Sequence, residues 1–276
     1  MQTSHPLRPP HQNDDFSRSE KLPLVTIVIS TLNAEATLEK CLGSIFSQIY
    51  PHIEIIIADG LSNDRTMEIV RQHAREGLRW ISEPDRGIYD AWNKALPISK
   101  GDWLYFLGAD DVLFNDRAIQ HFVDAQAELK EKPFLIYGDV LLATNFGMTK
   151  RVGLPWRQAR KLAGRIMPIP HQGVFHSKKL FELTGEFDRS YRIAADYKKV
   201  LQAIKLTDPV YIPGWIVAAR GNEGVSSQLK NRLRAMRENE RARRELGVST
   251  HPLFKLDLLK AHVWSILAFA ATVLRR

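Results

Sequence analysis

Residues 24–33, with the sequence LVTIVISTLN, decide the fold. The part from Leu24 to Ile29 is almost wholly apolar and rich in β-branched residues, which is typical of a strand buried on both faces. Polar residues from Ser30 to Asn33 end this run, and apolar residues then recur at helical spacing, at Leu38, Leu42, Ile45 and Phe46. The segment therefore predicts a β-strand followed directly by a helix.

The same strand–helix unit repeats along the chain. Short apolar runs predict further strands at 53–57, 78–81, 102–107 and 134–137, and helical patterns follow at 66–74, 88–95 and 118–129. Alternation of this kind predicts an α/β fold: a mainly parallel open sheet with right-handed crossovers, flanked by helices. After Tyr137 the pattern loosens, and we expect residues 147–170 to form loops and short elements over a crevice.

Polar residues gather where the predicted strands end. They are Thr31 with Asn33, Asp59 with Asp64, Asp85 with Asp90, and Asp110 with Asp111. Ligands of open α/β sheets bind beyond the carboxyl ends of the strands. We therefore expect four loops to converge on one ligand-binding crevice.

Asp110 and Asp111 follow an apolar strand directly. Carboxylate oxygens suit hard cations, so the pair predicts a Mg²⁺ or Mn²⁺ site that also takes substrate phosphates. Such a metal would neutralise charge on a diphosphate leaving group. The alternative is that the pair caps the following helix, where Asp is also favoured.

For three other polar residues, the sequence allows a functional role or a purely structural one. Asp59 could accept a hydrogen bond from a nucleotide base, or belong to a simple turn and helix cap. Asp196 stands at the start of a predicted helix, where a carboxylate is usually stabilised by the helix dipole. His171 could bind metal or phosphate, or be structural.

The composition limits the class of protein. The chain has 276 residues, 44% hydrophobic and 25% charged, which fits a globular domain with an appendage. Its net charge of +8 favours anionic partners such as nucleotides or anionic lipid. Cys41 is the single cysteine, so no internal disulfide can form, and this fits a reducing, cytoplasmic location.

Four motifs together resemble one known family. Residues 25–33 resemble an opening strand and donor loop, 58–66 (ADGLSNDRT) a nucleotide-base loop, and 107–111 (LGADD) a metal-binding Asp-x-Asp region. Residues 83–94 (EPDRGIYDAWNK) match a signature of one branch. From Val25 to about Gln202 the chain thus resembles a family 2 glycosyltransferase with the GT-A fold, of the bacterial surface-polysaccharide type.

The resemblance implies roles for individual residues. It implies an inverting hexosyl or related transfer from a UDP-, GDP- or dTDP-linked sugar to a glycan or lipid-linked acceptor. Asp196 matches the catalytic base, which overturns its structural interpretation, and Asp110 with Asp111 would face Mn²⁺ or Mg²⁺. The donor nucleotide would be held by Thr31, Asn33, Asp59, Asp85, Asp90 and Asp110. The acceptor side or pocket would include Tyr89, Asn93, His171 and Gln172.

The sequence departs from the family pattern at one position. Many members carry a further Asp where this chain has Gly108. The motif is therefore reduced to Asp110-Asp111, which bears on how the donor ribose is held and how tightly metal binds.

The predicted organisation has three parts: a disordered leader at 1–22, a GT-A domain at 23–229, and basic and amphipathic helices at 230–276. The helix at 230–246 is rich in Arg and Glu, and a solvated surface is the simpler interpretation. The apolar segment 253–274 is too short to span a bilayer, and it predicts either packing on protein or peripheral contact with an anionic membrane at its cytoplasmic face.

Two other classes of protein are alternatives. A nucleotidyltransferase also combines an α/β sheet with metal-binding carboxylates, but a Gly-rich basic loop is common after its first strand, and residues 30–33 (STLN) are not such a loop. The second alternative is a non-catalytic nucleotide-sugar or glycan-binding module. Only the resemblance at Asp196 argues against it. Nucleic acid is not an expected partner, since no recognition motif is present.

Overall fold

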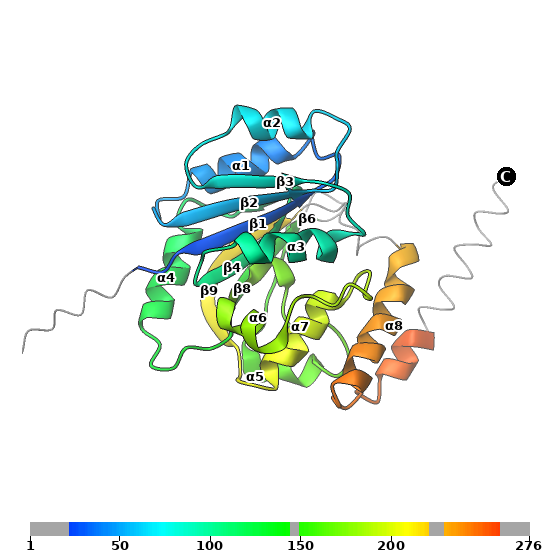
Figure 1. Ribbon diagram of the computed structural model, residues 1–276. Helices are drawn as coiled ribbons and strands as arrows, with labels where there is room; N and C mark the ends of the chain where they lie inside the picture. The colour runs from blue at the N-terminus through cyan, green and yellow to red at the C-terminus, as the bar shows by residue number, and fades with distance from the viewer. Residues whose placement is uncertain (1–21, 144–148, 221–228, 260–276) are drawn as a thin grey trace, which may run out of the picture.

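The computed structural model describes residues 22–143, 149–220 and 229–259. Its core is one sheet with the strand order β3-β2-β1-β4-β8-β6-β9-β5, and β7 pairs with β6 (Figure 1). The first half of the sheet is the predicted parallel part. Its strands are β1 (Val25–Thr31), β2 (Ile53–Asp59), β3 (Leu78–Ser82) and β4 (Trp103–Gly108). Thr31 pairs with Asp59, and Ser30 pairs with Gly108, so three strands end at the same edge.

The second half of the sheet is mixed, which differs from the mainly parallel sheet that the sequence predicts. β8 runs antiparallel to β4 and β6, while β6 and β9 are parallel to each other. The strands of this half are β5 (Asp111–Leu113), β6 (Leu135–Ala143), β7 (Thr149–Val152), β8 (Val174–Ser177) and β9 (Val210–Arg220). An α/β protein with an open, curled sheet is confirmed.

Helices cover both faces of the sheet because side chains along each strand alternate between the faces. Ile27 and Ile29 of β1 pack in a cluster with residues of α1, α2 and α4, whereas Val28 packs in another with residues of α3 and α7. The helices are α1 (Leu38–Phe46), α2 (Thr66–Gln72), α3 (Ile88–Ala95), α4 (Ala118–Ala127), α5 (Trp156–Ala159), α6 (Lys178–Thr184), α7 (Ala195–Ile204) and α8 (Leu229–Glu245). Short 3₁₀ turns are η1 (Leu96–Ile98), η2 (Arg160–Leu162) and η3 (His171–Gly173).

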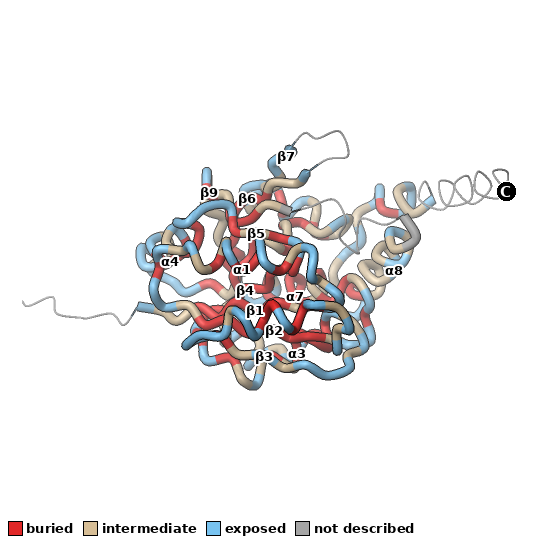
Figure 2. Tube along the Cα trace, turned by 90° about the horizontal axis from the view of Figure 1, so that it is seen from above, coloured by how far each residue is buried: buried red, intermediate tan, exposed pale blue. Residues whose placement is uncertain are grey.

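The C-terminal helix α8 packs against the domain rather than standing free in solvent. Arg243 is fully buried, donates to the Tyr197 hydroxyl at 3.1 Å, and lies over the Phe254 ring. The tube in Figure 2 shows buried positions concentrated in the sheet and beneath its helices. Among the described helices, none is both long and apolar enough to cross a membrane. Residues 1–21 of the predicted leader (1–22) and the segment 260–276 lie outside the described residues.

Candidate functional site

Asp59, at the end of β2, is the centre of a polar cluster. Its carboxylate accepts hydrogen bonds from the Thr31 hydroxyl (3.0 Å), the Ser62 N–H (3.0 Å) and the Ser82 hydroxyl (2.7 Å). Asp59 and Thr31 are both buried. Because this carboxylate is fixed by donors from β1, β3 and the loop after β2, its orientation is set before any ligand arrives.

The loops around Asp59 are held to one another. Asn33 has a φ of 51°, accepts a bond from the Asn63 N–H at 3.0 Å, and donates its own N–H to Ser62 at 2.9 Å. Asp85 accepts from the Gly87 N–H at 2.7 Å. It also packs so closely on Gly60 that a Cβ there would lie 2.4 Å from its Oδ2. The structure therefore brings Thr31, Asn33, Asp59 and Asp85 together.

The end of β4 presents two carboxylates beside Gly108. A Cβ at Gly108 would meet Asp110 Oδ1 at 2.8 Å and Asp111 Oδ2 at 2.9 Å. Asp111 is buried and Asp110 is exposed. Burial, helped by Asp111 and Asp110, raises the pKa of the Cys41 thiol below them, so this thiol stays neutral. Because residue 108 is a glycine without a side chain, both carboxylates have space to approach the end of β4.

These two carboxylates fit a hard divalent cation that completes its shell with water and substrate phosphates. Within the described residues, no group of three or more His, Cys, Asp or Glu side chains could hold a metal ion. A cation here would be held by Asp110 and Asp111 together with groups of the donor, rather than by a cage made of protein alone.

A cavity of about 500 Å³ opens beside these carboxylates. Asp110 and Asp111 line it on one side, and Asp196, His171 and Tyr89 line it on another. Gln172 also lines the cavity, and its carbonyl accepts a bond from the Tyr105 hydroxyl at 2.7 Å. The cavity lies at the end of β4, and residues 152–154, 162 and 166–170 form part of its wall. Thr31, Asp59 and Asp85 are not among its lining residues, so the convergence of four loops on one crevice stays a prediction.

Asp196 lies in the first turn of α7 and points to this cavity. Its Oδ1 accepts from the Tyr197 N–H at 2.8 Å and lies 3.0 Å from the Tyr89 hydroxyl, whose single proton is shared with the Ile193 carbonyl at 2.5 Å. Burial and the negative charge of Asp196 raise the pKa of Tyr89, which keeps that hydroxyl protonated as a donor. His171 Nδ1 lies 4.0 Å from Asp196 Oδ2, and its ring stacks on Trp92 at 5.0 Å. The second carboxylate oxygen is thus left facing the cavity and His171.

Glu238 of α8 holds the segment that leads into α7, and the sequence reasoning missed it. Its carboxylate accepts from the N–H groups of Arg192 (3.0 Å), Ile193 (2.8 Å) and Ala194 (2.9 Å). These N–H groups lie just before the helix and have no intrahelical partner. No sequence pattern marked Glu238, because its partners lie more than forty residues away.

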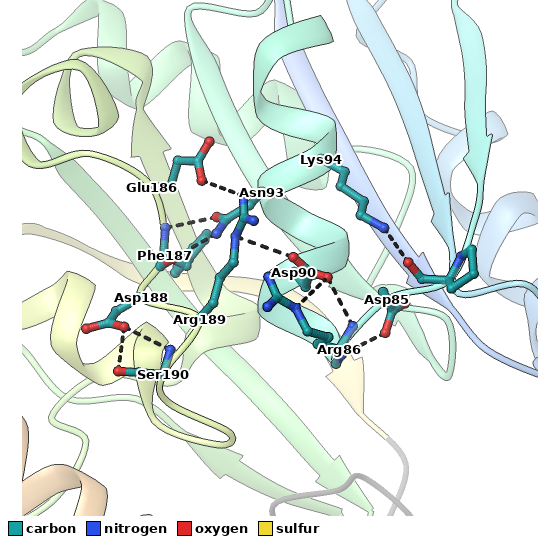
Figure 3. A network of polar contacts seen from close by, with 12 residues as sticks. Asp85, Arg86, Asp90, Asn93, Lys94, Glu186, Phe187, Asp188, Arg189 and Ser190 are labelled. Atoms are coloured by element: carbon teal, nitrogen blue, oxygen red, sulfur yellow. Dashed lines mark hydrogen bonds and ion pairs between the residues drawn. The ribbon is translucent and has the colours of Figure 1, made fainter.

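Two predicted binding residues make contacts within the protein (Figure 3). Asn93 is buried and exchanges two hydrogen bonds, of 2.8 and 2.9 Å, with the backbone of Phe187. Asp90 accepts from the Arg86 N–H at 3.0 Å and pairs with Arg189 at 3.3 Å. Burial raises the pKa of Asp90, but the Arg86 hydrogen bond and the nearby arginines outweigh it and lower the pKa overall. Neither residue lines the cavity, and the donor role of Asp90 and the pocket role of Asn93 stay predictions.

The fold and the carboxylate-bearing strand ends define an α/β protein of the glycosyltransferase type, and comparison with known proteins agrees. The model of glycosyl transferase family 2 matches residues 26–132. A PGL/p-HBAD biosynthesis glycosyltransferase of Mycobacterium tuberculosis is 37% identical over 179 residues, which cover 63% of this chain and 67% of that protein. An uncharacterized glycosyltransferase of the same species is 31% identical over 198 residues, covering 69% and 72%. The chain belongs to glycosyltransferase family 2.

Solved structures share the fold at low sequence identity. The mannosyltransferase PcManGT from Pyrobaculum calidifontis, in complex with GDP-Man and Mn²⁺, superposes with a TM-score of 0.65 at 17% identity, covering 93% of this chain and 82% of that one. Residues 1–349 of S. aureus TarS, in complex with UDP-GlcNAc, give 0.62 at 16% identity, covering 79% and 66%. The predicted GT-A fold is confirmed.

Proposed function

We propose that this chain transfers a sugar from a nucleoside-diphosphate sugar to a hydroxyl of its acceptor, with inversion at the anomeric carbon. The main observation that supports this proposal is that Asp196, Asp110 and Asp111 line one cavity of about 500 Å³. A base on one wall and diphosphate-facing carboxylates on another suit a single displacement across the space between them.

In this mechanism Asp196 Oδ2 takes the proton of the acceptor hydroxyl as that oxygen attacks the anomeric carbon. The bond between the sugar and the diphosphate breaks, and the nucleoside diphosphate leaves. The Tyr197 N–H donates to Oδ1, and the Tyr89 hydroxyl, shared with the Ile193 carbonyl, lies 3.0 Å from the same oxygen. These contacts orient the carboxylate and leave Oδ2 to receive the proton. His171, 4.0 Å from Oδ2, would help to position the acceptor oxygen.

The donor would lie along the strand ends of the parallel half. Asp59, held by Thr31, would bind the nucleotide base, with Asn33 and Asp85 shaping the surrounding loops. Neighbouring strands lie about 5 Å apart, so a nucleotide can reach from Asp59 past β1 to Asp110 at the end of β4. The PcManGT structure holds GDP-Man and Mn²⁺, which supports a donor of this class and a divalent metal. When bound, Mn²⁺ or Mg²⁺ would neutralise charge on the diphosphate.

A panel of UDP-, GDP- and dTDP-sugars with Mn²⁺ or Mg²⁺ and a mixed acceptor extract tests the proposal. We expect one donor to turn over, and we expect Asp196→Asn to lower kcat by about 10²- to 10⁴-fold while donor affinity is kept. Equal turnover by the variant would exclude Asp196 as the base. Thermal stabilisation by a donor without turnover by any sample would favour a non-catalytic nucleotide-sugar-binding module.

The setting of the reaction is part of the proposal. The mycobacterial relative named for PGL/p-HBAD biosynthesis supports a role in cell-envelope or polysaccharide biosynthesis at the cytoplasmic face of the membrane, with a glycan or lipid-linked acceptor. Contact with anionic membrane through the C-terminal segment is tested by flotation with anionic vesicles. A chain lacking 260–276 that floats as well as the full chain would contradict this contact.

A further inference from the structure

Residues 142, 152–154, 162 and 166–170 contribute an apolar wall to the cavity. Every cavity-lining residue described between 142 and 170 is Leu, Val, Gly, Ile, Met or Pro. The charged residues that line the cavity come from other segments, and they are Asp110, Asp111, Arg192 and Asp196. The cavity therefore combines this apolar wall with charged groups that come from other segments.

Several large side chains of this cavity are left open to solvent. Ile166 is 47% exposed, Ile88 is 39% exposed and Leu154 is 36% exposed, although they belong to three separate segments. A single exposed apolar residue is ordinary, but several around one cavity mark a place where an apolar ligand is received. Exposed apolar side chains make the free protein less stable. A ligand that covers them removes this loss of stability.

We propose that the acceptor hydroxyl is carried on an apolar aglycone, an alkyl chain or aryl group, which occupies the side of the cavity formed by Leu142, Val152, Leu154, Leu162, Ile166 and Met167. This inference rests on the proposed function and chooses between its two acceptor classes. A purely polar glycan placed on this wall would lose water from its hydroxyl groups and find no polar side chain in return. A volume of about 500 Å³ is enough for a small ligand that reaches from Asp196 to this wall.

The apolar wall also lies close to Asp196, where the aglycone of a bound acceptor would extend. It is continuous with His171 through Pro168, Ile169 and Pro170, and His171 lies 4.0 Å from the carboxylate of Asp196. A hydroxyl held beside Asp196 would therefore have its attached group directed along this wall. The ionic side remains available for the diphosphate of the donor.

The test measures binding of methyl, butyl, hexyl and octyl β-D-glucopyranosides to the full chain by calorimetry, below the concentrations at which they form micelles. Maltotriose is the polar comparison. We expect one binding site and an affinity that rises about threefold to fourfold for each added methylene, with methyl glucoside and maltotriose binding weakly. Affinity that does not depend on chain length, or tighter binding of maltotriose, would overturn the proposal.

Substitutions on the apolar wall test whether octyl glucoside binds there. Ile166→Asp places a charge on the apolar wall and is expected to weaken octyl glucoside binding by about tenfold or more. Because Ile166 is half exposed, the variant should fold, and Leu154→Asp provides the same test at a second position. Leu183→Asp is the matched control, since Leu183 is 65% exposed on α6 and does not line the cavity. Unchanged binding by both wall variants would refute the site.

Failure of this inference can be told apart from failure of the proposed function. Asp196→Asn is expected to bind octyl glucoside as the unmodified chain does, because it alters the base and not the wall. Donor turnover without any dependence on alkyl length would overturn only the apolar acceptor. Binding that depends on alkyl length, together with no turnover of any donor, would count against the transferase mechanism and leave the apolar site in place.

Discussion

The two sides of the crevice are built in different ways. The donor side lies at the ends of β1, β2 and β4, where Asp59 accepts several hydrogen bonds and Asp111 is buried. The proposed acceptor side consists of the described lining residues at 142, 152–154, 162 and 166–170 together with the start of α7, and much of this wall is apolar and partly exposed. One side is a fixed set of polar groups, whereas the other is a surface that a ligand would complete.

This difference follows from what each side has to recognise. A nucleoside diphosphate carries charge and a base with fixed donors and acceptors, so its site needs polar groups held in place beforehand. An apolar aglycone is recognised mainly by the area that it covers, and many shapes of wall can provide that area. Substitutions on the donor side should therefore act sharply on metal and donor affinity, and those on the acceptor side should act on kcat or on the acceptor.

The largest expected effect is that of Gly108→Ala on the donor side. A Cβ there would lie 2.8 Å from Asp110 and 2.9 Å from Asp111, so both carboxylates must move. Because the displaced groups are the tips of side chains, the protein should still fold. We expect the Mn²⁺ concentration for half-maximal donor turnover to rise about 10- to 100-fold.

Gly43→Ala is the control for this substitution. A Cβ at Gly43 would have no atom within 4 Å, and this glycine lies in α1, away from the cavity. The control should keep the metal dependence of the unmodified chain. If Gly108→Ala keeps it as well, the two carboxylates do not hold the metal.

A smaller effect is expected from Glu238→Ala, which acts on the acceptor side through α8. Removing this carboxylate releases the N–H groups of Arg192, Ile193 and Ala194 and loosens the segment that carries Asp196. We expect kcat to fall about tenfold while the donor Kd stays unchanged, since a misplaced base lowers the rate more than donor binding.

The conservative variant Glu238→Gln keeps one amide oxygen as an acceptor and should recover part of the rate. Glu240→Ala, two residues further along α8, is the matched control and should leave kcat unaffected. A fall in donor affinity equal to the fall in kcat would mean that Glu238 supports the whole domain rather than the position of Asp196.

The sequence alone predicted the parallel half of the sheet and the polar edge at which its strands end. The strands β1, β2 and β4 are apolar runs buried on both faces, and their polar ends fall in adjacent loops, so local pattern was enough to place Thr31, Asp59 and Asp110 at one edge. It could not predict the mixed half of the sheet. β7 and β8 are each four residues long, and β8 pairs with β4 and β6, which are distant from it in the sequence.

The contacts of two predicted binding residues could not be predicted for the same reason. Asp90 and Asn93 stand in a family-like signature on α3, which gives no information on which side chains turn towards the cavity and which turn towards Phe187 and Arg189. Their partners come from a segment about a hundred residues later. Glu238 was missed for a similar reason, since a glutamate in an Arg-rich helix also fits an exposed ion pair.

The smallest expected effect concerns the contacts that hold α8 in place. Hydrogen bonds from Lys198, Tyr191 and Arg241 lower the pKa of Glu245 from its ordinary value of 4.5 to about 2. Burial raises the pKa of Asp188, but its bonds from Lys198 and Ser190 lower it overall, also to about 2. Lys198 bridges these two carboxylates at 2.8 and 2.6 Å and so joins α7 to α8.

A carboxylate whose pKa is lower in the folded protein stabilises the fold when ionised. This contribution is complete above about pH 4.5, and it is lost as the pH falls through that range towards about 2. Glu245→Gln should therefore lower the free energy of unfolding near neutral pH by less than about 1 kcal/mol, since the pair is partly exposed, and this difference should shrink near pH 3. Urea unfolding at the two pH values measures it, with Glu182→Gln on α6 as the exposed control. A difference that does not change with pH would show that Glu245 holds α8 by packing rather than by charge, and the acceptor side would then keep its geometry in acid.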